Sequence, residues 1–449
     1  MRRTPVLWSA TAAVALLLAS APARANGRFP TSVSVSFRPG STQDIYLGVT
    51  YGFLISHDDG ASFRWLCEQN VGYEGTFDPK YRVAADGTIY ATTFEGLRVS
   101  RDGGCSFETA TAGAPTSDPG RIAGIWIDAI DTGPDGSVWV GTAEAGRPNE
   151  VFRSTDGART FQPVGLTSTV TWWKSIAVAP SRAQRAYVTG YQVTQTAPDG
   201  GVISPTVHVE KTDDAGQSWT SLPIGDFLLG TSPLVLVEEV APDDPDLVFV
   251  RSVRAVPPAG DKLYRSTDGG ATWAEVLETT DTIRNVVMRA DGTVLVATAM
   301  GGVHSSTDRG ASFEPLATSP QAACLGDRGD ALFACGANWE PDLFSLGRSA
   351  DAATWSKVFR FVEMKGPLDC PVGTVQRDVC EAQLWPSVRE QFGVPEEPRP
   401  DGDPTPREPG GCCDARGGAT GAGAIALGAV VVVAVRRRRR RCCGEPDPG

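Results

Sequence analysis

Short apolar runs separated by polar turns fill the chain between residues 31 and 360. Three pairs of runs are joined through an Asp-Gly step, in YRVAADGTIYATT (81–93), IDTGPDGSVWVGT (130–142) and VVMRADGTVLVAT (286–298). An Asp-Gly step favours a tight hairpin because glycine tolerates positive φ. The pattern therefore predicts antiparallel β-hairpins. Abundant glycine (50) and proline (33) also argue against a helical bundle.

A short polar segment recurs after a third apolar run in each unit. Its pattern is S/T-x-D-x-G-x-S/T-F/W, with one shortened copy that lacks the glycine. The copies lie at 56–63, 100–107, 154–161, 212–219, 266–273, 306–313 and 349–355, with aspartates Asp58, Asp102, Asp156, Asp214, Asp268, Asp308 and Asp351. Steps of 40 to 58 residues between these aspartates are typical of propeller blades. We therefore expect an all-β, seven-bladed β-propeller over residues 26–360.

The recurring segment resembles the Asp-box, or bacterial neuraminidase repeat. This repeat occurs in sialidases, some endoglucanases, sortilin-type receptors and photosystem assembly factors, so the resemblance implies a propeller and leaves the function open. We expect the hydroxyl and carboxylate of each copy to bond their own loop, with the aromatic residue packed between blades. A structural role is favoured because chemistry needs one asymmetric site, not seven symmetric copies.

Both ends of the chain predict export. Residues 1–25 read as a signal peptide, with Arg2 and Arg3 before an apolar stretch and small residues at Ala23 and Ala25. After the propeller we expect a small cysteine-containing cap at 361–393, with a short helix near Val379–Phe392. A proline-rich stalk follows at 394–411.

Residues 412–443 combine a cysteine pair (Cys412, Cys413), an uncharged stretch at Gly417–Val435 and six arginines, before a tail at 444–449. The stretch is long enough to form one transmembrane helix, and the arginines favour the cytoplasmic side. This combination resembles the myxobacterial C-terminal sorting signal. The resemblance implies a sorting protease as partner and attachment to the cell surface; an ordinary single-span anchor remains the alternative.

Charge and cysteine content narrow the possible partners. The net charge of −12 disfavours nucleic acid. In an exported chain the cysteines predict disulfides, and we expect the pairs Cys370–Cys380, Cys324–Cys335 and, by elimination, Cys67–Cys105. Since no C-x-x-C pair exists and the three histidines are scattered, no metal site and no cofactor are expected.

The candidate binding surface is the rim opposite the recurring segments. There the turn between the second and third strands is long in blades 3, 4 and 5, and long loops on a rigid scaffold often carry binding sites. The candidate contacts are Trp172, Trp173, Lys174, Glu144, Arg147, Tyr191, Arg254 and Asp261. One of the two tryptophans is expected to point into the core.

These observations predict a surface-anchored recognition module for a glycan or protein ligand. A sialidase-like glycoside hydrolase and a structural surface-coat protein remain alternatives. Sialidase chemistry needs three arginines, a tyrosine paired with a glutamate and an acid. The chain offers the adjacent Tyr73 and Glu74, but no spacing selects three arginines. Catalytic residues are therefore left unassigned, and a non-enzymatic role is preferred.

Overall fold

The computed structural model describes residues 28–192, 195–196, 202–203, 207–224, 234–253 and 260–396. The predicted signal peptide and the predicted membrane span at 417–435 lie outside these residues. In the described part of the chain, no helix has both the length and the apolar character needed to cross a membrane.

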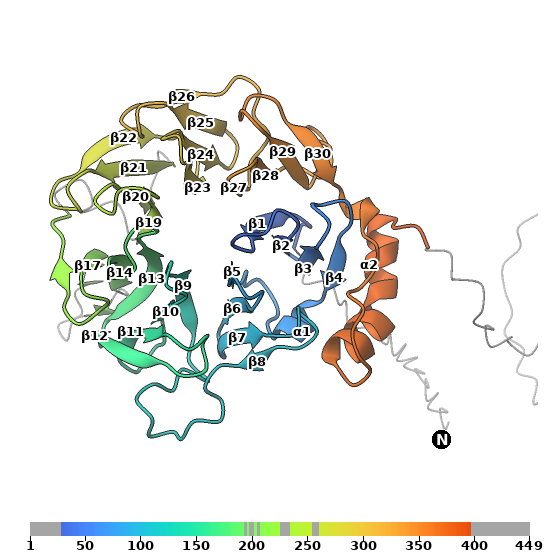
Figure 1. Ribbon diagram of the computed structural model, residues 1–449, viewed down its shortest axis with the longest axis horizontal. Helices are drawn as coiled ribbons and strands as arrows, with labels where there is room; N and C mark the ends of the chain where they lie inside the picture. The colour runs from blue at the N-terminus through green and yellow to red at the C-terminus, as the bar shows by residue number, and fades with distance from the viewer. Residues whose placement is uncertain are drawn as a thin grey trace, which may run out of the picture. The chain divides into compact units, whose positions relative to one another are not determined.

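Seven four-stranded antiparallel sheets form a closed ring within the described residues, which confirms the predicted all-β propeller (Figure 1). Blade 1 contains β1 (Ser32–Phe37), β2 (Ile45–Val49), β3 (Gly52–Ser56) and β4 (Arg64–Leu66); blade 2 contains β5 (Tyr81–Val83), β6 (Ile89–Thr93), β7 (Gly96–Ser100) and β8 (Glu108–Thr109); blade 3 contains β9 (Ile127–Thr132), β10 (Val138–Thr142), β11 (Asn149–Ser154) and β12 (Gln162–Ser168). The first strand of each blade faces the centre of the ring.

The remaining blades repeat this order. Blade 4 contains β13 (Thr171–Val178), β14 (Ala186–Gln192), β17 (Val207–Thr212) and β18 (Thr220–Ser221); blade 5 contains β19 (Leu234–Val240), β20 (Val248–Val253), β21 (Asp261–Ser266) and β22 (Ala274–Glu278); blade 6 contains β23 (Ile283–Met288), β24 (Val294–Thr298), β25 (Gly302–Ser306) and β26 (Glu314–Pro315); blade 7 contains β27 (Cys324–Asp327), β28 (Leu332–Cys335), β29 (Leu346–Ser349) and β30 (Ser356–Phe359). The long turn of blade 4 carries a small ribbon of β15 (Gln195–Thr196) and β16 (Val202–Ile203).

The Asp-Gly steps form the predicted hairpins. In blade 2, Val83 pairs with Ile89, and Gly87 between them has φ +90°. The Asp86 carboxylate accepts a hydrogen bond from the Thr88 backbone N–H at 2.9 Å, which closes the turn.

Each recurring segment forms the loop between the third and fourth strands of its blade. In blade 1, the Ser56 hydroxyl donates to Asp58 at 2.7 Å and accepts from the Gly60 N–H at 2.9 Å, while Asp58 accepts from the Ser62 N–H at 2.9 Å. The same hydrogen bonds from serine or threonine recur at Asp102, Asp156, Asp214, Asp268 and Asp308. These carboxylates therefore bond their own loops.

The hydrophobic core lies between neighbouring blades. Phe161, which ends the recurring segment of blade 3, packs with Tyr90 and Val99 of blade 2. Phe63 of blade 1 packs against Phe359 of blade 7, with ring centroids 4.4 Å apart. The aromatic residue of a segment thus joins its blade to the preceding one.

A helical cap follows blade 7. It comprises a 3-10 turn (Phe361–Glu363), a π-helix (Gln376–Leu384) and α2 (Trp385–Phe392), and so includes the region where a helix was predicted. Between the 3-10 turn and the π-helix, the chain pairs in parallel with β4, through the Trp65 N–H to the Gly366 carbonyl at 2.9 Å and the Leu368 N–H to the Trp65 carbonyl at 2.9 Å.

Disulfides join the cap to two blades. Cys324 and Cys335 are bonded across β27 and β28, as predicted. The other two predicted pairs are wrong, because Cys67 bonds Cys380 and Cys105 bonds Cys370. The cap lies on blade 1 and approaches the loop that bears Cys105, so each cap cysteine meets a blade cysteine instead of its neighbour in sequence.

Candidate functional site

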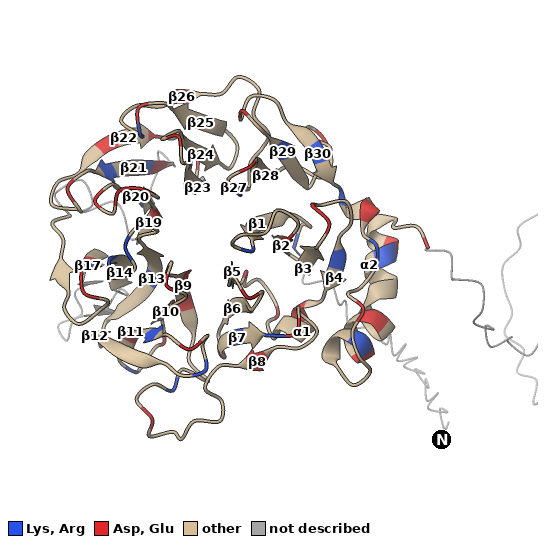
Figure 2. Ribbon diagram, in the orientation of Figure 1, with Lys and Arg blue, Asp and Glu red and all other residues tan. Residues whose placement is uncertain are grey.

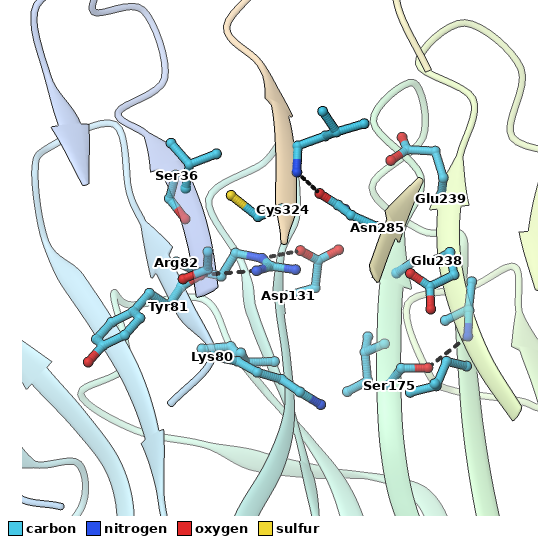
Figure 3. A pocket seen from close by; sticks show the side chains of 18 of the residues that line it. Ser36, Lys80, Tyr81, Arg82, Asp131, Ser175, Glu238, Glu239, Asn285 and Cys324 are labelled. Carbon is cyan, nitrogen blue, oxygen red and sulfur yellow. Dashed lines mark hydrogen bonds and ion pairs between the residues drawn. The ribbon is translucent and has the colours of Figure 1, made fainter. Parts of the chain in front are cut away.

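A cavity of about 940 Å³ occupies the centre of the ring. Its walls are the inner strands of the blades, and Figure 3 shows polar side chains from β9 and β19 around it. Acidic positions on these two strands also face the centre of the ring in Figure 2. The channel therefore differs from the apolar space between blades.

Asp131 of β9 and Glu239 of β19 are the channel carboxyls of greatest chemical interest. Asp131 accepts hydrogen bonds from Arg82, whose Nε lies 2.9 Å from Oδ1, and from the Val178 N–H, 2.8 Å from Oδ2. The Glu239 carboxyl makes no hydrogen bond or ion pair with another described residue. Burial raises the pKa of Glu239 well above its ordinary value, and the charge of Asp131 raises it further.

The channel therefore holds one carboxyl group whose burial favours the protonated form and one carboxyl group that is bonded to a guanidinium group. Carboxyl groups in such different environments are suited to acid–base work. We refer to Asp131 and Glu239 as the channel pair.

Glu238, the neighbour of Glu239, forms an ion pair with Arg251. Its Oε1 lies 2.6 Å from Nε of Arg251, and Arg251 also reaches the buried Asp261 at 3.0 Å. Asp261 accepts a further bond from the Ile283 N–H at 2.9 Å. This network ties blade 5 to blade 6, so Glu238 and Asp261 act in the structure of the wall.

A cluster of charges lies nearer the rim opposite the recurring segments. Lys174 donates to the Asp128 carboxylate at 2.6 Å, and Lys80 donates to the backbone carbonyls of Asp128 at 2.5 Å and Lys174 at 2.8 Å. Burial lowers the pKa of Lys80 to about 8, although the nearby Asp128 opposes the shift. One lysine of blade 2 thereby braces the inner strands of blades 3 and 4.

Local irregularities of the strands explain this cluster. Asp128 and Lys174 are each the extra residue of a β-bulge, because their neighbours pair with consecutive residues of β10 and β14. A bulge redirects the side chain of its extra residue. Here two oppositely charged side chains meet.

Five aromatic rings follow the same rim across blades 2, 3 and 4. Consecutive ring centroids are 4.6 Å apart for Phe77–Phe94, 4.9 Å for Phe94–Trp126, 5.4 Å for Trp126–Trp172 and 6.0 Å for Trp172–Tyr191. Phe94 is 49% exposed, and the other four are partly buried. We call these five residues the aromatic row. They come from turns and strand ends of three blades and form one continuous surface.

The structure separates the predicted binding residues. Trp172 and Tyr191 lie together in the aromatic row. Glu144 borders the row, because its carboxylate accepts a hydrogen bond from the backbone N–H of Trp126 at 3.1 Å. Trp173 is 3% exposed and packs in the core, so one tryptophan of the pair does point inward.

The other predicted contacts do not join this surface directly. Lys174 belongs to the charge cluster, Arg147 is exposed on its turn, and Asp261 is buried in the wall. Arg254 lies outside the described residues.

Sequence reasoning missed Phe94, Trp126 and Glu239. Phe94 and Trp126 each lie at a blade end, where an aromatic residue in a short turn carries no periodic signal. Glu239 follows another glutamate in the apolar strand LVLVEEV. Charged residues are rarely buried without a partner, so two glutamates in such a strand could have indicated a functional site.

The arginines of the channel do not form a sialidase-type triad. Four arginines line the cavity, and three of them, Arg28, Arg82 and Arg251, are each paired with a carboxylate of the protein. Arg284 is the fourth. Tyr73 is 7% exposed and packs in the core near Tyr81, while Glu74 is exposed. The residues named for that chemistry therefore do not converge.

No protein-family model matches the chain. A curated relative from Neosartorya fischeri, named "Probable oligoxyloglucan-reducing end-specific xyloglucanase", is 28% identical over 179 residues. The match covers 34% of this chain and 21% of the relative, so the chain spans about a fifth of that protein's length.

Solved structures with a similar fold include two GH74 proteins. The GH74 enzyme of Niastella koreensis has a TM-score of 0.42 at 14% identity, over 72% of this chain and 65% of that one. The GH74 xyloglucanase of Xanthomonas campestris has a TM-score of 0.40 at 14% identity, over 73% and 66%. The third, YCF48 bound to D1 peptide, has a TM-score of 0.44 at 12% identity, over 68% and 90%. At these scores they say nothing about the activity of this chain.

The curated relative corrects one prediction from sequence. A recognition module without catalysis was the preferred reading, whereas the relative is named for a hydrolase. The alternative of a glycoside hydrolase is therefore the better supported of the two.

Proposed function

We propose that the chain is a glycoside hydrolase that acts on a β-glucan chain of the xyloglucan type. The observation that carries the proposal is the channel pair, two carboxyl groups that line one cavity, of which Glu239 has its pKa raised by burial and Asp131 is bonded to Arg82. Glycoside hydrolysis uses two carboxyl groups, one as a proton donor and one as a carboxylate. The name of the curated relative supports the substrate class.

In this proposal Glu239 is the general acid. Its proton passes to the glycosidic oxygen as the bond to the anomeric carbon breaks, and the leaving sugar departs with a new hydroxyl group. Asp131 acts as the carboxylate of the pair, and Arg82 and the Val178 N–H fix its position. Its negative charge stabilises the positive charge that develops on the sugar ring. The oxygen of a water molecule then bonds to the anomeric carbon, and the proton that the water loses returns to Glu239 and restores the acid.

The aromatic row supplies the binding surface for the glucan. The apolar face of a pyranose ring stacks well on an aromatic ring, while its hydroxyl groups need polar neighbours. Glu144 and the Asp128–Lys174 pair provide such neighbours beside Trp126 and Trp172. The inner strands lead from this rim into the channel, where the channel pair lies.

An assay of the full-length chain on xyloglucan and cellohexaose tests the proposal, with released reducing ends as the readout. We expect turnover by the native protein and a loss of at least about a hundredfold in Glu239→Gln, since general acid catalysis contributes that much. Asp131→Asn should lose activity to a similar degree. The matched control is Glu314→Gln, on the exposed outer strand β26. Full turnover by Glu239→Gln would refute the assignment.

We also propose that the chain is an exported Asp-box protein held at the cell surface. Six loops with a common hydrogen-bond pattern support the family assignment, and three disulfides suit an oxidising compartment. Cell fractionation of the native protein and a Cys412→Ser/Cys413→Ser variant tests the location. Surface attachment of the native protein and its loss in the variant are expected.

A further inference from the structure

A second exposed aromatic group lies between blade 7 and blade 1. The rings of Phe29 and Trp339 meet edge to face, with centroids 5.1 Å apart. Phe29 is 72% exposed and Trp339 is 41% exposed, and Leu343 beside them is 44% exposed. Large apolar side chains gathered on a surface indicate a binding site more often than chance exposure.

The turn that carries Trp339 is rigidly built. The Asp342 carboxylate accepts hydrogen bonds from the Ala337 N–H at 2.7 Å and the Gln321 N–H at 3.1 Å. The buried Asn338 accepts from the Ser345 hydroxyl at 2.6 Å and the Phe361 N–H at 2.9 Å. The turn is therefore fixed to both its own blade and the cap, which lowers the entropic cost of using Trp339 for binding.

The backbone around Phe29 is also fixed by hydrogen bonds. Its carbonyl accepts a bond from the Thr50 hydroxyl at 3.0 Å, and the same hydroxyl accepts from the Thr31 N–H at 3.1 Å. On its other side, Arg28 forms a two-fold ion pair with Asp78, with Nη1 2.6 Å from Oδ1. Phe29 is thus anchored at both ends although its ring faces solvent.

The Arg28–Asp78 ion pair connects this group to the aromatic row. Arg28 adjoins Phe29 in sequence and lines the channel, while Asp78 adjoins Phe77, the first ring of the row. In a four-stranded meander the turn between the second and third strands and the segment before the first strand lie on the same face, so the turn between β28 and β29 and the segments before β1 and β5 open on one rim. Along the rim, the rings of Phe29 and Trp339 are therefore followed by the Arg28–Asp78 ion pair and then by the aromatic row.

We infer that Phe29 and Trp339 form a second sugar-stacking subsite, which extends the aromatic row across the Arg28–Asp78 pair and binds a further part of the same glucan chain. Aromatic rings interrupted by fixed donors and acceptors match the alternating apolar faces and hydroxyl groups of a glycan. A single short oligosaccharide does not need a surface that spans blades 7, 1, 2, 3 and 4. The inference rests on the proposed function for its substrate class and predicts a preference for long chains.

A binding experiment with two probes tests the subsite. Cellotriose and cellohexaose are titrated by calorimetry into the full-length Glu239→Gln protein, in which hydrolysis is blocked. Adding Phe29→Ala and Trp339→Ala should weaken cellohexaose binding by about tenfold and cellotriose binding by less than about twofold, because loss of one stacking site costs about that factor. Trp172→Ala should weaken the binding of both probes. Val372→Ala, on the cap and 85% exposed, is the matched control.

Several outcomes overturn the inference. Equal weakening of both probes by the Phe29/Trp339 change does so, as does no weakening while Trp172→Ala still acts. A native dimer that becomes monomeric in the Phe29/Trp339 variant, by sedimentation, would assign the rings to self-association instead. Length-dependent binding without hydrolysis by the native protein supports the subsite and refutes only the catalytic proposal.

Discussion

Single carboxyl groups in this ring differ sharply in their affinity for protons. Hydrogen bonds from the Thr272 hydroxyl and backbone N–H lower the pKa of Asp268 to about 2. Glu239 moves in the opposite direction because burial disfavours its charge. Among the described residues, hydrogen-bond donors surround the Asp268 carboxylate, whereas none bonds the Glu239 carboxyl. Local hydrogen bonding therefore decides which carboxyl group can serve as an acid.

Stability should reflect the protonation of Glu239. A raised pKa in the folded state gives stability that is fully present below the unfolded value, near 4.5, and is lost as the pH rises through the folded value. Within that window the native protein should lose up to about 1.4 kcal/mol of unfolding free energy per pH unit relative to Glu239→Gln. Urea titrations of both proteins between pH 4 and pH 9 measure this difference. Parallel pH profiles would show that Glu239 ionises normally.

At the scale of elements, the recurring loops depend on a buried hydroxyl. Ser100 is fully buried, donates to Asp102 at 2.8 Å and accepts from the Gly104 N–H at 2.9 Å. Ser349 in the shortened copy keeps the bond to its aspartate, at 3.1 Å, but accepts no comparable bond four residues later. The full-length copies therefore make a second hydrogen bond to this hydroxyl, from a glycine N–H or, in blade 3, from the Ala158 N–H.

This difference predicts unequal effects of the same substitution. Ser100→Ala leaves the buried Gly104 N–H without its acceptor and should cost about 1 to 3 kcal/mol of unfolding free energy. Ser349→Ala loses fewer bonds and should cost less than about 1 kcal/mol. Denaturant unfolding of the two variants compares them directly. A larger effect at Ser349 would mean that the loop does not depend on this hydroxyl.

Elements were predictable from sequence where local chemistry repeats. The hairpin at Asp86-Gly87 and the loop at Asp58 each follow from a few adjacent residues. The aromatic row was only half predictable, because Trp172 and Tyr191 lie in the expected sector whereas Phe94 comes from a short turn of blade 2 and Trp126 from the segment before β9. The pKa of Glu239 is raised first by burial and then by the charge of Asp131, and both depend on closure of the ring because Asp131 is distant in sequence.

At the scale of the whole molecule, closure of the ring depends on its first and last blades. Each blade is built from its own run of the chain, so no strand is exchanged across the seam between blades 7 and 1. Arg328 of blade 7 bonds Asp59 of blade 1 at 2.7 Å, and the cap pairs with β4 and bonds Cys67 through Cys380. The disulfides were mispredicted because this long-range packing decides which cysteines meet.

Removal of individual disulfides should expose this dependence. The Cys67–Cys380 bond spans 313 residues and the Cys324–Cys335 bond spans 11. Since the Cys105–Cys370 bond already closes most of the longer loop, the chain-entropy relation gives about 4 kcal/mol for the first and about 3 kcal/mol for the second. Paired serine substitutions at each bond, followed by thermal unfolding, should therefore lower the Tm more for Cys67/Cys380. If Cys324/Cys335 proves the more damaging loss, the cap is dispensable and packing at Arg328 and Phe63 closes the ring unaided.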